Sequence, residues 1–159
     1  MALITSMYSV KLSRENHNMN KTETLVGKGF QVLLLMKNLR DLNRTEYSTV
    51  QKILWTYEDN QKLLNNEKDR YSFWEQRMRI ISEDLDKEWK IQEEFLRARE
   101  DADIKTLEDY LGYYNVSLAY TASAKDFAVE YLKELEEKVR KDGLANQGLE
   151  QRGEEKNTN

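Results

Sequence analysis

The chain has 159 residues, of which 34% are charged and 10% aromatic, and its formal net charge is −4. It contains no cysteine and no proline, which excludes disulfides and thiolate chemistry and favours long, uninterrupted helices. The aromatic content argues against wholesale disorder, and the length suits a single domain.

Residues 1–23 are predicted to form an N-terminal arm, either a short strand or disordered. The first 14 residues contain two bases and no acid, a composition that loosely suggests a mitochondrial transit peptide. As a strand, however, this segment would place Ile4, Tyr8, Val10 and Leu12 on one face. We therefore expect a cytoplasmic protein, with a mitochondrial location as the alternative, and residues 1–18 as an optional extension.

The rest of the chain, residues 24–143, is predicted to form one helical domain. A first helix is expected over about 24–42. The stretch DLNRTEYS (41–48) then breaks the apolar pattern, and Ser48 and Gln51 have the spacing of a capping box. A long helix is therefore expected over about 46–100, with a possible further break within residues 63–68.

The apolar pattern of this long helix is typical of an imperfect coiled coil. Trp74, Met78, Ile81, Leu85 and Trp89 follow one another at steps of three and four, although polar residues such as Gln92 occupy other positions of the same seam. Asp101 and Asp103 favour a cap over a helix interior, so the chain is expected to fold back within residues 99–106. A third helix over about 104–142 then completes a long antiparallel hairpin, followed by a disordered tail over 144–159.

The stretch 110–132 differs from the charged remainder because it is rich in aromatic and small residues. Tyr113, Tyr120 and Phe127 recur every seven residues, and a second line holds only the small residues Ser117, Thr121, Ala124 and Ala128. Small residues allow helix axes to approach closely. We interpret the stretch as a packing seam, formed either within the chain or between two molecules. Trp74 and Trp89 are interpreted as core anchors, with exposed anchors for a partner as the alternative.

No catalytic or metal-binding constellation is recognisable. The single histidine, His17, lies in a polar stretch, so the Glu-x-x-His motif of carboxylate-bridged metal sites cannot be built. The paired acids Glu83/Asp84 and Glu93/Glu94 are typical of solvated helix faces. The segment GKGF (27–30) lacks the spacing of a phosphate-binding loop. We therefore predict no catalytic, cofactor-binding or metal-binding residue, no cofactor and no enzymatic activity, and keep an unrecognised enzyme as a minor alternative.

The sequence favours a non-enzymatic scaffold or adaptor that associates with itself, most simply as a dimer, or with another protein. The candidate interface residues are Tyr113, Ser117, Tyr120, Thr121, Ala124, Phe127, Ala128, Trp74 and Trp89. One alternative is a nucleic-acid accessory protein that uses the basic residues Lys28, Lys37, Arg40 and Arg44. Another is a viral or mobile-element accessory protein that inhibits a host protein. The longest apolar run, Val32–Met36, is too short to span a membrane.

Overall fold

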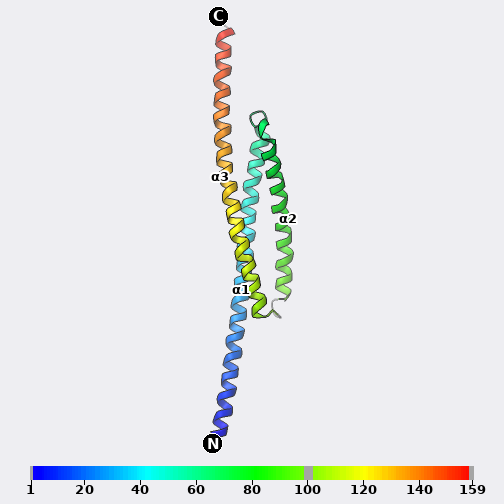
Figure 1. The fold of residues 1–159 in the computed structure, drawn as a ribbon, viewed down its shortest axis with the longest axis vertical. Coiled ribbons are helices and arrows are strands. Elements are labelled where there is room, and N and C mark those ends of the chain that lie inside the picture. Colours follow the sequence, from blue (N-terminus) through cyan, green and yellow to red (C-terminus); the bar gives the residue numbers. More distant parts are fainter. Residues whose placement is uncertain (1, 99–101, 158–159) are drawn as a thin grey trace.

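The computed structural model describes the backbone of residues 2–98 and 102–157, and the side chains of residues 13–98 and 102–145. It contains three α-helices: α1 (Ala2–Asp59), α2 (Lys68–Ala98) and α3 (Ile104–Asn157). A single 3₁₀ turn, η1 (Asn65–Glu67), precedes α2. The predicted all-α fold is confirmed, as a three-helix bundle (Figure 1).

The helices run up, down and up along one long axis, so that α1 and α3 are parallel and α2 is antiparallel to both (Figure 1). Lys28 of α1 pairs with Glu108 near the start of α3, and Tyr57 near the end of α1 meets Tyr131 further along α3. The N-terminal part of α1 and the C-terminal part of α3 extend beyond the bundle at opposite ends (Figure 1). The three-helix bundle is therefore the middle section of the molecule.

The predicted arm and the predicted break at residues 43–45 are wrong, because α1 is continuous from Ala2 to Asp59. The polar residues that suggested a cap are accommodated inside the helix. The hydroxyl of Thr45 donates to the carbonyl oxygen of Asp41 at 2.8 Å, and that of Thr49 donates to the carbonyl oxygen of Thr45 at 3.0 Å. A hydroxyl that is satisfied one turn back need not end a helix.

The expected long helix of residues 46–100 is instead divided by the turn at 60–67, close to the break considered possible at 63–68. The amide groups of Leu63 and Leu64 donate to the carbonyl oxygen of Asn60 at 3.0 and 3.1 Å, which tightens the end of α1 into a turn. Leu64 is buried and fastens this turn to the core. The chain therefore reverses its direction twice, once between α1 and α2 and once between α2 and α3, whereas a single hairpin of two long helices was predicted.

The second reversal lies where it was expected. Asp103 precedes α3, and its Oδ1 accepts a hydrogen bond of 2.7 Å from the amide of Thr106, as an N-cap does. This hydrogen bond holds the pKa of the Asp103 carboxyl below its usual value. Asp101, the other proposed cap, lies outside the described residues. α3 then continues past Gly143 to Asn157, so the predicted end at residue 142 and the predicted disordered tail are also wrong.

The core follows one repeat in all three helices. Eight buried positions on α1 follow alternating steps of four and three: Val32, Met36, Leu39, Asn43, Glu46, Val50, Ile53 and Tyr57. Thr49 is buried beside this line. α2 contributes Trp74, Ile81 and Phe95, and α3 contributes Leu107, Tyr114, Thr121, Ala128 and Leu135 at steps of seven. This is the spacing of coiled-coil cores. The apolar members divide into two clusters, one towards each end of the bundle.

Candidate functional site

A polar layer separates the two apolar clusters at the middle of the bundle. Asn43 and Glu46 of α1, Glu88 of α2 and Thr121 of α3 occupy core positions there, between the apolar residues of the two clusters in each helix. Buried polar groups in a helical seam fix the register of the helices, and each needs a hydrogen-bond partner. The partners of this layer are therefore informative about its role.

Glu46 has no exposed surface, yet only one of its two oxygens is paired. Its Oε1 accepts a hydrogen bond of 2.6 Å from Nε of Arg77, whose side chain is 17% exposed. The guanidinium of Arg77 also lies 5.9 Å from the centre of the Tyr120 ring. Oε2 of Glu46 has no partner in the described part of the chain.

Glu88 repeats this arrangement on α2. Its Oε1 accepts a hydrogen bond from Nδ2 of Asn43, whereas its Oε2 is buried and unpaired within the described residues. Burial raises the pKa of the Glu88 carboxyl to about 7, and the charge of Asp84 adds to the effect, while Asn43 and Arg40 oppose it. Two acceptor oxygens thus remain unused within the same layer.

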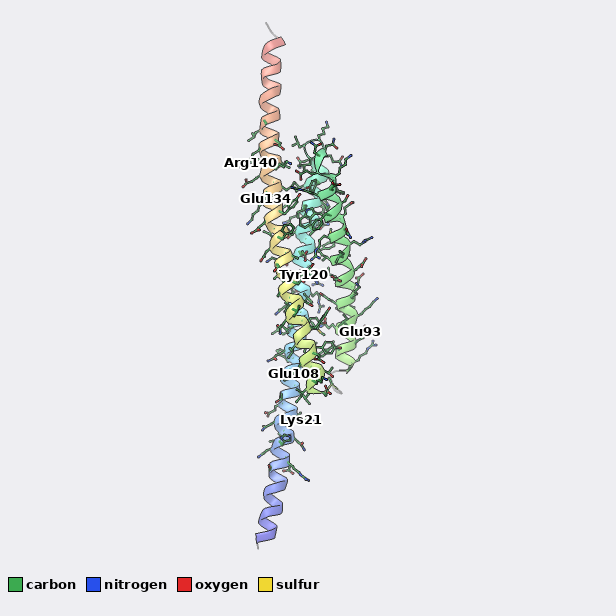
Figure 2. The ribbon with its side chains drawn as sticks, in the orientation of Figure 1. Lys21, Glu93, Glu108, Tyr120, Glu134 and Arg140 are labelled. Carbon is green, nitrogen blue, oxygen red and sulfur yellow. The ribbon has the colours of Figure 1, made fainter. Side chains whose placement is uncertain are left out.

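An open groove reaches this layer from outside, because α2 and α3 each pack along α1 while their own described backbones stay apart. Large side chains bridge the gap at only a few points. The Trp74 ring stacks on Phe127 at a centroid distance of 5.8 Å, and Phe95 meets Tyr110 at 5.2 Å. Between these bridges, the α2–α3 groove contains two hollows on either side of Tyr120, which lies about midway along the bundle (Figure 2).

The first, the apolar hollow, has a volume of about 500 Å³ and is lined by Trp74, Ile80, Ala124 and Phe127 together with Glu46 and Arg77. The second, the acidic hollow, has a volume of about 340 Å³ and is lined by Asn43, Asp84, Glu88, Ser117 and Thr121 among others. Tyr120 borders both. Each unpaired carboxylate oxygen is itself buried and belongs to a residue that lines one hollow, so the two oxygens lie beneath the groove.

Exposed rings form the rim of the α2–α3 groove. Tyr113, Tyr120 and Phe127 are 60%, 67% and 55% exposed. Phe73 and Ile80 of α2 line the apolar hollow together with Tyr120 and Phe127. Each of the three α3 rings immediately precedes a core residue, namely Tyr114, Thr121 or Ala128. A residue one step from the core line is turned by about 100° away from it, so these rings lie beside the seam and not inside it. Clustered exposed aromatics mark interaction surfaces.

The interface candidates predicted from the sequence therefore divide into residues packed against the other helices and residues exposed on the surface. The small residues Ser117, Thr121, Ala124 and Ala128 are buried or half-buried, which places their line against the other helices. Trp74 is 2% exposed and anchors the core, whereas Trp89 is 63% exposed and lies under the guanidinium of Arg40.

A second surface, the basic face of α1, collects most of the basic candidates. Phe30 and Leu34 are exposed there, and three bases, Lys37, Arg40 and Arg44, line a hollow that contains one acid, Asp41. Arg40 is held by Oε1 of Gln92, but Lys37 and Arg44 are exposed and form no ion pair within the described residues. Lys28 lies apart from them, paired with Glu108 at 2.7 Å.

Sequence reasoning missed Asn43, Glu46, Asp84, Glu88 and Arg77 as site residues. A signal for them was present, because Asn43 and Glu46 continue the four-and-three repeat that runs from Val32 to Tyr57. Glu88 likewise lies seven residues from both Ile81 and Phe95. A polar residue that keeps the phase of a core line is a candidate for a buried polar layer.

A further hollow, of about 330 Å³, lies at the turn between α1 and α2. Two of its polar residues, Tyr57 and Glu67, are already paired within the chain. The Tyr57 hydroxyl donates to Oε2 of Glu67 at 3.1 Å and also meets the Tyr131 hydroxyl, and Lys138 donates to the other oxygen of Glu67. These contacts hold the turn between α1 and α2 against α3.

Comparisons with protein-family models, with curated proteins and with solved structures find no match to this chain. Within the described residues, no helix is both long and apolar enough to cross a membrane. Among the residues that the structure describes, no group of three or more histidine or acidic side chains could hold a metal ion.

Proposed function

We propose that the protein is a non-enzymatic helical assembly protein that binds a helix in the α2–α3 groove. The observation that carries this proposal is the combination of exposed rings on the rim with unpaired carboxylate oxygens in the residues beneath them. A solvated surface gains nothing from exposing Tyr113, Tyr120 and Phe127 together, whereas a docking surface does.

A helix is the ligand whose shape suits the groove. α2 and α3 both pack on α1 and leave the α2–α3 groove between them. A fourth helix in that groove would complete a four-helix bundle. Helices dock in such grooves through large side chains spaced by one or two turns. Ala124 in the apolar hollow and Ser117 in the acidic hollow are seven residues apart on α3, or about 10 Å at the rise of a helix.

The basic residues favour this proposal over nucleic-acid binding. Lys28 and Arg40 are occupied by contacts within the chain, whereas Lys37 and Arg44 form no ion pair or hydrogen bond with their side chains among the described residues. Two free bases beside the exposed apolar side chains of Phe30 and Leu34 form a surface better suited to a protein than to a phosphate backbone.

The test is site-specific crosslinking. A photoreactive amino acid replaces Ser123, which is exposed and lines the apolar hollow, and the control variant carries the same group at the exposed Lys52 of α1. We expect a discrete protein adduct from position 123, in cells that naturally contain the protein, and none from position 52. The proposal is wrong if position 123 gives no adduct or gives the same adducts as position 52.

A further inference from the structure

The α2–α3 groove and the basic face of α1 are complementary in both charge and apolar character. The acidic hollow is lined by two acids and one base, Asp84, Glu88 and Lys87, and Nζ of Lys87 lies 3.7 Å from Oδ1 of Asp84. The hollow on the basic face is lined by three bases and one acid. Each surface also exposes large apolar side chains, Phe127 and Tyr120 on one and Phe30 and Leu34 on the other. The two surfaces lie on different parts of the same molecule, so they can meet only between two copies.

The spacing of the side chains agrees with such a contact. Phe30 and Lys37 are seven residues apart on α1, which is the separation of Ala124 and Ser117 along the groove. With Phe30 in the apolar hollow, Lys37 reaches the acidic hollow, which is lined by Asp84 and Glu88. Phe30 is 69% exposed in one copy, so burying it in another removes apolar area from water.

We infer that the groove of one copy receives the basic face of α1 from a second copy, with Phe30 in the apolar hollow and Lys37 at Glu88. This inference rests on the proposed function, because it names the helix that the groove binds. In this orientation the α1 helix of the second copy runs antiparallel to α3. A two-fold axis across the bundle produces such a relation and lets the two copies exchange the same contact.

Charge reversal on each side of the contact provides the test. The double variant K37E/R44E changes two exposed side chains of the basic face, and D84K changes a side chain of the acidic hollow. The matched control, K52E/K62E, reverses two exposed bases outside both surfaces. Mass is measured by light scattering over a range of concentrations, and thermal unfolding confirms that each variant is folded.

We expect the wild-type protein and the control to form dimers. K37E/R44E and D84K should each raise the dissociation constant on the order of tenfold, since like charges then face each other. An equimolar mixture of these two variants should associate again, because an acidic face then meets a basic groove. A monomeric wild type at all concentrations, or a K37E/R44E variant that associates like the control, overturns the inference.

The crosslinking experiment separates this inference from the proposed function. An adduct between position 123 and residues 30–44 of another copy supports both. An adduct with a different protein, together with a monomeric wild type, supports a helix-binding groove but shows that its occupant is not a second copy. No adduct at position 123 contradicts both.

Discussion

Arg77 and Glu46 join α2 to α1 through a 2.6 Å hydrogen bond between Nε of Arg77 and Oε1 of Glu46, a carboxylate with no exposed surface. The two residues differ in their access to water, since the Arg77 side chain remains 17% exposed. A buried charge that loses its partner is costly, whereas a partly exposed one can be hydrated. Removing Arg77 should therefore cost more folding stability than removing the charge of Glu46.

Replacing the two residues separately should show this asymmetry. Arg77→Met leaves Glu46 buried and unpaired, and should lower the free energy of unfolding by about 3–5 kcal/mol. Glu46→Gln keeps an acceptor for Arg77 and should cost only about 1–2 kcal/mol. Urea unfolding monitored by circular dichroism measures both. Equal costs for the two variants would show that Glu46 reaches water or another partner.

Trp74 and Trp89 form a matched pair for testing which tryptophan stabilises the fold. Trp74 is buried and packs against Phe127 and Tyr131, so Trp74→Ala should cost about 3–5 kcal/mol. Trp89 is exposed and contacts Arg40, so Trp89→Ala should cost less than about 1 kcal/mol. Thermal unfolding of the two variants checks the difference. A large loss of stability in Trp89→Ala would mean that assembly buries this ring.

The difference between the two tryptophans also shows how far the sequence predicts the fold. Helical content, the fold-back near Asp103 and the core role of Trp74 follow from residue type and spacing alone. Apolar spacing alone predicts a seam that runs from Leu85 to Trp89, whereas the core line continues through the polar Glu88. The same preference for apolar residues places Asn43 in a predicted break, although its phase fits a continuous helix.

The groove could not be predicted for a different reason. Its existence depends on α2 and α3 packing on α1 without closing on each other, and this depends on the relative rotation of three helices. A one-dimensional repeat identifies the seam position of Tyr114, Thr121 and Ala128, but not whether the neighbouring rings of Tyr113, Tyr120 and Phe127 are covered by another helix.

Filling the α2–α3 groove should separate stability from assembly. Ala124 is half-buried at the wall of the apolar hollow, so Ala124→Leu should occupy space that a docking helix needs. We expect the free energy of unfolding to change by less than about 1 kcal/mol, while association measured by light scattering is lost. Tyr120→Ala should likewise weaken association more than stability, because its ring is exposed.

Glu130→Leu is the control for the groove variants. It introduces the same residue as Ala124→Leu, but at an exposed position of α3 outside the lining of the groove. Association should persist in this variant. If Ala124→Leu and Tyr120→Ala also associate normally, helix docking does not take place at Tyr120.

Glu88 should make stability depend on pH in the direction opposite to a typical carboxylate. Burial raises the pKa of its carboxyl to about 7 from an ordinary value of 4.5, so the folded state binds this proton more tightly than the unfolded state does. The contribution is fully present below pH 4.5 and is lost as the pH rises towards 7. The expected loss is about 2 kcal/mol, with allowance for partial solvent screening.

Glu88→Gln isolates this effect from the titration of other groups, because glutamine keeps the acceptor for Asn43 but does not ionise. Urea unfolding at pH 5 and pH 8 should show that the wild type loses more stability than the variant as the pH rises. Parallel pH dependences in the two proteins would show that the Glu88 carboxyl is ionised throughout this range. A smaller loss in the wild type at concentrations where it associates would indicate that a cation from the second copy holds Glu88 in its charged form.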